Sequence, residues 1–131
     1  DILDKKRISI FNNNSKDFIN GDVVDGFNEV IIYDFKNNEH LYYLLDSLKK
    51  NEVRTITEGT SQILQNGDLF IEETNFGRTL YFNADGSLRW THLNRGDDGN
   101  VYLISWSRII YSKKDIIDVN HFLKTKEACN A

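Results

Sequence analysis

The sequence predicts an all-β fold built from short antiparallel strands. Between residues 60 and 93, four runs rich in β-branched and aromatic residues alternate with three turn sequences. The turns are Asn66-Gly67, Asn75-Phe76-Gly77 and Asn83-Ala84-Asp85-Gly86. Four strands joined by three tight turns form an up-and-down antiparallel sheet about the size of one β-propeller blade. Because the blades of a propeller share a central channel, one blade cannot contain a whole site.

The four strands of this blade are predicted at residues 61–65, 68–74, 78–82 and 87–93. Asn66-Gly67 favours a two-residue type I′ turn, because both residues tolerate positive φ. Gly77 and Gly86 can adopt the left-handed conformation that longer hairpin loops need. Residues 53–57 predict a strand that enters the blade, followed by a bend at Glu58-Gly59. We therefore predict one complete blade at about residues 53–93.

Further strands are predicted on both sides of the blade. Alternating and β-branched runs predict strands at 7–11 and 29–35, with a long loop over 12–28 between them. The run 40–48 fits either a helix or a strand, and we place a strand into Tyr43 and a helical turn at 46–50. After a polar loop at 94–100, the apolar run 101–111 predicts a bent strand or a strand pair. Residues 116–123 predict a short C-terminal helix.

Composition narrows the classes of protein and partner. With 131 residues, 40% apolar content and 27% charge, the chain is expected to form one soluble domain. A net charge of −4 without a clustered basic face argues against nucleic acid as a partner. No apolar run approaches the roughly 20 residues that span a bilayer, so no membrane segment is predicted. The lone Cys129 allows no disulfide within the chain, and the missing initiator Met suggests a processed form or a piece of a longer protein.

No metal or cofactor is predicted. His40, His92 and His121 lack the spacing of a zinc site, and Asp97-Asp98 lacks the ligand ladder of a calcium loop. Glu72 and Glu73 are neighbours on a strand and should point to opposite faces, so they are not expected to act as an acid/base pair.

Two tryptophans and one arginine are the notable side chains outside the turns. We expect Trp90 and Trp106 to pack between sheets, with stacking on a ligand as the alternative. Arg108 lies among apolar residues and should need an anionic partner. That partner is expected to be an internal carboxylate such as Glu58 or Asp97, with a bound oxyanion as the alternative.

Six sequence blocks are informative when they are taken together and in order. They are Ile8-Ser9-Ile10-Phe11-Asn12-Asn13, Arg54-Thr55-Ile56-Thr57-Glu58-Gly59, Leu64-Gln65-Asn66-Gly67-Asp68-Leu69-Phe70-Ile71-Glu72-Glu73, Gly77-Arg78-Thr79-Leu80, Trp90-Thr91-His92-Leu93-Asn94-Arg95 and Trp106-Ser107-Arg108-Ile109. Together these blocks resemble the C-terminal part of the bacterial arylsulfotransferase family. The resemblance implies a six-bladed propeller that transfers a sulfuryl group from an aryl sulfate to a phenol without a nucleotide donor. Residues 1–131 would then be a single domain, the C-terminal part of the propeller. An extracytoplasmic location would follow from the same resemblance.

The resemblance also implies a transiently sulfurylated histidine in the channel, supported by further histidines and an arginine. That nucleophile is expected just before the strand at Ile8, whereas the first histidine in this chain is His40. Neither His40 nor the two later histidines match the family's positions, so no catalytic residue is assigned and the isolated chain is predicted to be inactive. The alternative is a non-catalytic scaffold or binding module.

The residues expected to contact substrate lie where the innermost strand of the blade meets the channel mouth. They are Thr55, Thr57 and Glu58, together with Arg108 on the following blade. Threonine hydroxyls can donate to sulfate oxygens, and the guanidinium can hold them as a planar charged fork. The alternative is a Glu58–Arg108 ion pair that locks adjacent blades. Exposed sheet edges predict self-association.

Overall fold

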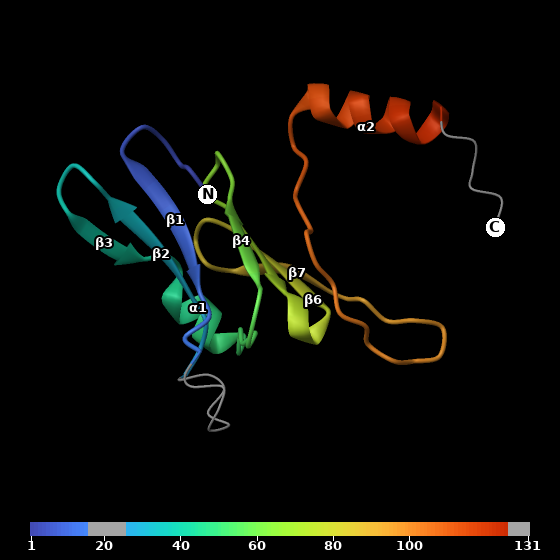
Figure 1. Ribbon diagram of the computed structural model, residues 1–131, viewed down its shortest axis with the longest axis horizontal. Coiled ribbons are helices and arrows are strands. Elements are labelled where there is room, and N and C mark those ends of the chain that lie inside the picture. The colour runs from blue at the N-terminus through green and yellow to red at the C-terminus, as the bar shows by residue number, and fades with distance from the viewer. Residues whose placement is uncertain (16–25, 126–131) are drawn as a thin grey trace.

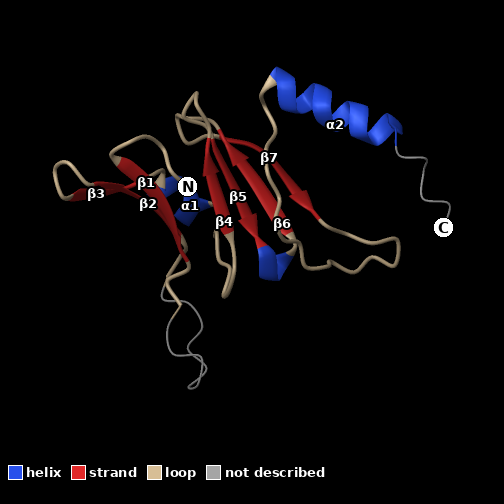
Figure 2. Cartoon of the chain, turned by 45° about the horizontal axis from the view of Figure 1, so that its top comes forward, coloured by secondary structure: helices blue, strands red, loops and turns tan. Residues whose placement is uncertain are grey.

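The computed structural model describes residues 1–15 and 26–125 and confirms the all-β fold class (Figures 1 and 2). The first sheet has the spatial order β1 (Arg7–Asn12), β2 (Glu29–Asp34), β3 (Glu39–Tyr42). The second has the order β4 (Thr60–Ile63), β5 (Leu69–Glu73), β6 (Arg78–Phe82), β7 (Leu88–Leu93). All neighbouring strands are antiparallel. The four strands expected between residues 60 and 93 are therefore present in the expected order.

In the described part of the chain, two α-helices and a short 3₁₀ helix, η2 (Thr74–Phe76), accompany the sheets. α1 (Leu45–Lys50) follows β3 and leads the chain toward the second sheet, which confirms the predicted helical turn. α2 (Lys113–Thr125) is longer than the predicted 116–123 and stands away from both sheets (Figure 1). Most of the predicted loop over 12–28, and Cys129, lie outside the described residues.

The main hydrophobic core joins the two sheets and α1. Its fully buried members are Val30 from β2, Leu48 from α1, Val53, and four residues of the second sheet, namely Leu69, Ile71, Leu80 and Phe82. A second cluster of Leu64, Phe70 and Tyr81 packs with Ile109. All five residues of β5 are buried, because strands flank it on both edges and side chains cover both of its faces.

Three hairpin turns share the same backbone conformation, which differs from the type I′ turn predicted at Asn66-Gly67. Gly67, Gly86 and Gly99 each have φ between 83° and 85°, whereas Asn66 is not at positive φ. In each turn the glycine N–H donates to the carbonyl three residues earlier, at 2.8 to 3.0 Å. This is a type I turn followed by a left-handed glycine, the common three-residue hairpin loop.

In the same three turns, the residue before the glycine adds a side-chain hydrogen bond. Asn66, Asp85 and Asp98 each accept the N–H two residues later through a side-chain oxygen, at 2.8 to 3.1 Å. This local bond is the reason that Asn and Asp are favoured before the glycine.

The predicted strand at residues 53–57 is absent, because side chains satisfy its backbone in place of a neighbouring strand. Asn28, which is fully buried, accepts the N–H of Thr55 and donates to the Thr55 carbonyl. Asn75 accepts the next two N–H groups through one oxygen, at 2.7 and 2.8 Å. These side-chain hydrogen bonds take the place of the backbone hydrogen bonds that a neighbouring strand would make. Sequence patterns do not reveal them.

The predicted strand at residues 101–111 is also absent. Apart from an isolated bridge between Arg95 and Val101, the segment is irregular and largely exposed. It is held to the second sheet by side chains, because Gln62 on β4 both donates to and accepts from the backbone of Ile109. Trp106 is 84% exposed, so the expectation that it packs between sheets is wrong. Trp90 lies on the second sheet, stacked on Tyr81 with ring centroids 5.6 Å apart.

Candidate functional site

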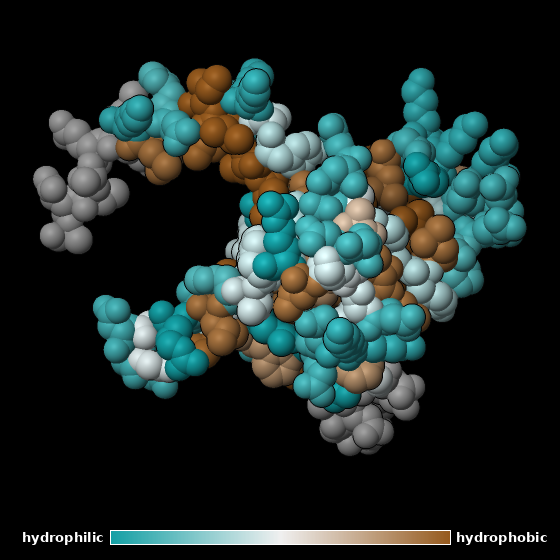
Figure 3. All heavy atoms as spheres, turned by 180° about the vertical axis from the view of Figure 1, so that it is seen from behind, coloured by the Kyte–Doolittle hydropathy of each residue, from teal (hydrophilic) through white to brown (hydrophobic). Residues whose placement is uncertain are grey.

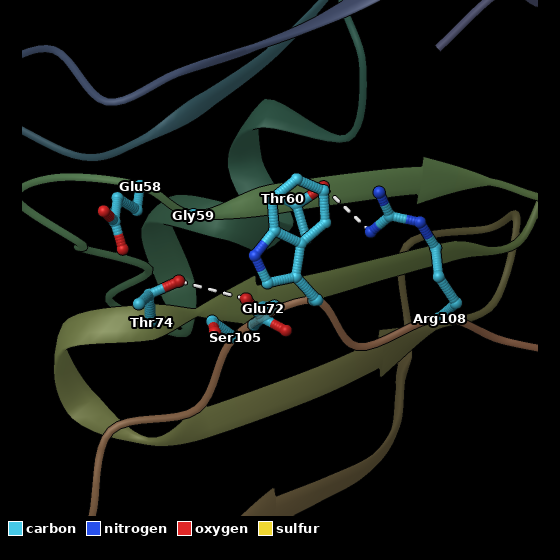
Figure 4. Close-up of a pocket in the computed structure, with 8 residues that line it drawn as sticks. Glu58, Gly59, Thr60, Glu72, Thr74, Ser105 and Arg108 are labelled. Carbon is cyan, nitrogen blue, oxygen red and sulfur yellow. Dashed lines mark hydrogen bonds between the residues drawn. The ribbon is translucent and has the colours of Figure 1, made fainter.

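A pocket of about 320 Å³ lies at one end of β4, where three segments meet (Figure 4). Residues 58–60 lead into β4, residues 72–74 span the end of β5 and the residue after it, and residues 105–108 belong to the irregular segment that crosses the second sheet. The lining residues are Glu58, Gly59, Thr60, Glu72, Thr74, Ser105, Trp106 and Arg108. The structure thus brings two of the four predicted substrate contacts, Glu58 and Arg108, into one pocket.

The backbone around this pocket is strained. Glu58 and Trp106 are non-glycine residues in the left-handed region, with φ of 56° and 64°, and Gly59 has φ of 45°. A side chain at Gly59 would lie 2.4 Å from the Thr55 methyl carbon and 2.5 Å from the Phe11 ring, so the position requires glycine. Left-handed non-glycine residues cost energy and tend to occur where a site demands an unusual backbone. Two of the six left-handed non-glycine residues in the described part of the chain, Glu58 and Trp106, line this pocket, and this makes it a candidate site.

Glu58 and Arg108, which were expected to form an ion pair between adjacent blades, are not paired with each other. Glu58 and Arg108 lie at opposite ends of the pocket (Figure 4). Arg108 donates through Nη1 to the Ser107 carbonyl at 2.9 Å and to the Thr60 hydroxyl at 3.4 Å. Among the residues that the structure describes, no ion pair joins Arg108 to Glu58, Asp97 or any other carboxylate. The expected internal partner is unnecessary because Arg108 is exposed to water.

Glu72 holds the segment that carries Trp106 and Arg108. Its carboxylate is on β5 with a relative exposure of 2%. One oxygen accepts the Ser107 N–H at 2.6 Å and the other accepts the Thr74 hydroxyl at 3.0 Å. A charge-assisted bond in a buried position is stronger than a neutral one, so Glu72 fixes Ser107 between the two pocket side chains.

Thr55 and Thr57 do not line the pocket but belong to the loop that presents Glu58. The Thr55 hydroxyl donates to the Asn75 side-chain oxygen at 2.7 Å, and the Asn75 amide donates to the Thr57 hydroxyl at 3.0 Å. Asn75 therefore ties this loop to the turn after β5. The two threonines act here as loop supports, and substrate contact by either hydroxyl stays a prediction.

The histidines do not enter this pocket. His40 is on β3, His92 on β7 and His121 on α2. Arg78, another candidate cation, forms an ion pair with Glu73, whose side chain is 1% exposed. Across residues 1–15 and 26–125, no cluster of three potential metal ligands occurs. Within those same ranges, no helix has the length and apolar character needed to cross a bilayer.

Sequence reasoning named Trp106 only as an alternative ligand contact and missed Glu72 as a part of the site. No signal marked Glu72, since its role depends on a backbone N–H donated from 35 positions away in the sequence.

Comparison with known proteins gives one match. A family model described as Arylsulfotransferase (ASST) matches residues 1–95. The matched range contains both sheets and the pocket residues from Glu58 to Thr74, while Ser105, Trp106 and Arg108 lie after it. No curated protein and no solved structure matches the chain.

Proposed function

The chain belongs to the arylsulfotransferase family, and from this membership we propose that it forms part of a β-propeller that transfers a sulfuryl group from an aryl sulfate to a phenol. In this proposal the pocket at the start of β4 lies at the channel mouth and contacts the substrate. The observation that carries it is the family match together with a strained pocket whose arginine has no carboxylate partner among the described residues.

The arrangement of the sheets supports the propeller. The chain leaves the first sheet from its last strand, β3, and enters the second sheet at β4, the strand that contacts β1. Residues 1–3 continue the first sheet, because Ile2 bridges Ile8. Residues 1–3, the end of β4 and two residues of the later segment, Arg108 and Tyr111, line one hollow of about 620 Å³. Neighbouring blades that meet at a common channel would produce this convergence.

Within the pocket, Arg108 is proposed to bind sulfate oxygens and Trp106 to offer its ring to the aryl group. A guanidinium presents several N–H donors in a plane and stabilises charge on a transferred oxyanion. Glu58 is proposed to contact the substrate at the other end. Thr55 and Thr57 support the loop that places Glu58.

The isolated 131-residue chain is proposed to bind substrate without turning it over. Transfer needs a nucleophile, a leaving-group acid and cationic stabilisation in one pocket, and this pocket offers only the last. With 4-nitrophenyl sulfate and phenol, the chain should release no nitrophenolate. Turnover would contradict the proposal, and turnover that survives replacement of His40, His92 and His121 would exclude these histidines as the nucleophile.

Binding is tested by calorimetric titration of phenyl sulfate. Replacement of Arg108 with Gln should weaken binding about tenfold with an unchanged melting temperature, since a hydrogen bond to a charged group contributes roughly 1.5 kcal/mol or more. Arg95→Gln, in the exposed loop after β7, is the matched control. A lower melting temperature with unchanged affinity for Arg108→Gln would give this residue a structural role.

The second candidate function is a non-catalytic scaffold or binding module, favoured by the absence of a histidine among the residues that line the pocket. Under this alternative the folded chain binds neither phenyl sulfate nor phenol. The same titration therefore distinguishes the two functions.

Self-association is proposed as well. All six residues of β7 are exposed, and apolar side chains are exposed along α2 and the segment before it (Figure 3). An open sheet edge with exposed apolar residues favours pairing with another chain. Sedimentation equilibrium should show a mass above 15.3 kDa at high concentration. A monomer throughout would contradict this.

A further inference from the structure

We infer that the pocket selects aryl sulfates that carry a cationic or hydrogen-bond-donating group at the end of the ring opposite the sulfate. This inference rests on the proposed function and names the substrate class of the same site. It follows from two opposite charges, Glu58 and Arg108, that line one pocket without pairing with each other.

The carboxylate of Glu58 is free for a ligand. Within the described part of the chain it takes part in no ion pair and no side-chain hydrogen bond. The other acid in the pocket, Glu72, is different, because both of its oxygens are engaged by Thr74 and Ser107. A donor group on a ligand would therefore be recognised by Glu58 and not by Glu72.

The position of Glu58 is fixed by the fold. Its left-handed backbone is followed by Gly59, where a Cβ atom would lie only 2.4 Å from the Thr55 methyl carbon and 2.5 Å from the Phe11 ring. Asn75 anchors the preceding residues through the N–H groups of Ile56 and Thr57. The backbone that carries Glu58 is therefore anchored on one side and left-handed, a combination that is typical of functional sites.

The remaining features fit an aromatic ring between two charged ends. A volume of about 320 Å³ is at the small end of the range for ligand pockets and suits a single ring with short substituents. Trp106 lines the pocket and is 84% exposed, so its indole can stack on that ring. With the sulfate at Arg108, the far end of the ring faces Glu58, since the two residues lie at opposite ends of the pocket (Figure 4).

The test compares two ligands that differ only in the far group. The dissociation constants of 4-(aminomethyl)phenyl sulfate and 4-ethylphenyl sulfate are measured by calorimetry on the full chain. The ammonium ligand should bind about fivefold more tightly, which corresponds to the upper end of the energy of an exposed ion pair. The preference should shrink as salt rises, because the pair is open to solvent.

Two variants test whether Glu58 causes the preference for the ammonium ligand. Glu58→Gln should reduce the ratio of the two constants to about one, while Glu39→Gln, which removes the same charge from exposed β3, should leave it unchanged. An unaltered ratio in Glu58→Gln, or a ratio near one in the wild type when both ligands bind, overturns the inference and leaves the proposed function standing. Binding of neither ligand overturns both. If Glu58→Gln does not fold, a wild-type ratio that does not change with salt overturns the inference.

Discussion

Strand β5 and the segment 101–111 are both rich in apolar residues, yet their environments are opposite. β5 is buried at all five positions and pairs with strands on both edges. Residues 101–111 are mostly exposed and find hydrogen bonds with single side chains, notably Glu72 and Gln62. Apolar composition therefore does not by itself predict a strand. A segment forms a strand when neighbouring strands are available to pair with its backbone. In this protein the packed region provides stability, and the exposed region supplies Trp106 and Arg108 to the candidate site.

The largest expected difference between the two regions comes from the same substitution made in each. Leu80 on β6 is 1% exposed and Leu103 is 67% exposed. Leu80→Ala should lower the free energy of unfolding by about 2–5 kcal/mol, because it removes buried contacts and leaves a cavity. Leu103→Ala should change it by less than about 0.5 kcal/mol. Urea unfolding measures both, and equal losses would show that the segment 101–111 is packed in solution.

Removal of a buried charge should have the next largest effect. Glu73 on β5 accepts the Arg54 N–H at 2.6 Å and pairs with Arg78. Glu73→Ala should lower the free energy of unfolding by about 2 kcal/mol, because it leaves Arg78 without its anionic partner. This is less than for a fully buried pair, because Arg78 is 28% exposed and water can solvate it. Asp118→Ala, which breaks the exposed pair with Lys114 on α2, should have no measurable effect. Thermal unfolding distinguishes the two.

The sequence predicted the second sheet well because its information is local. Asn66, Asp85 and their following glycines set the turns through bonds within five residues, and alternation between them sets the strands. It failed at residues 53–57 and 101–111 because their partners are distant side chains. The pocket shows the same division. Glu58 and Arg108 were predicted from residue type and position, whereas the hydrogen bond from the Ser107 N–H to Glu72 depends on tertiary contact.

A smaller effect is expected at the repeated turns. Gly67 and Gly99 have nearly the same φ, but a side chain at Gly67 would lie 3.1 Å from the Ala84 methyl, and one at Gly99 would meet nothing within 4 Å. Gly67→Val should lower the free energy of unfolding by about 1 kcal/mol or more, since β-branched residues resist positive φ. Gly99→Val should strain only its own loop, which can open without unfolding the sheet. Equal shifts in the urea midpoint would mean that the loop at 96–100 belongs to the cooperative core.

The smallest effect concerns acid. The Tyr102 hydroxyl, at 2.6 Å, and the Asn100 N–H hold the pKa of Asp98 below its ordinary value of 3.8. The Ser87 hydroxyl and N–H lower the pKa of Asp85 in the same way. A carboxyl group whose pKa is lowered by folding stabilises the fold above its unfolded pKa, and this contribution is lost as pH falls through the lowered value.

The two aspartates differ in what their turns connect, so acid should act differently on each. Asp85 closes the hairpin between β6 and β7, and Asp98 closes a loop outside the sheet. Below pH 3.8, Asp85→Asn should flatten the fall of the melting temperature with pH relative to the wild type, because one protonation coupled to global unfolding is removed. Asp98→Asn should leave that dependence unchanged and should abolish only the acid-induced shift of the Tyr102 ring signals in NMR spectra. If Asp98→Asn flattened the melting curve as much as Asp85→Asn, the exposed region would unfold together with the packed one, and the contrast between the two regions would fail.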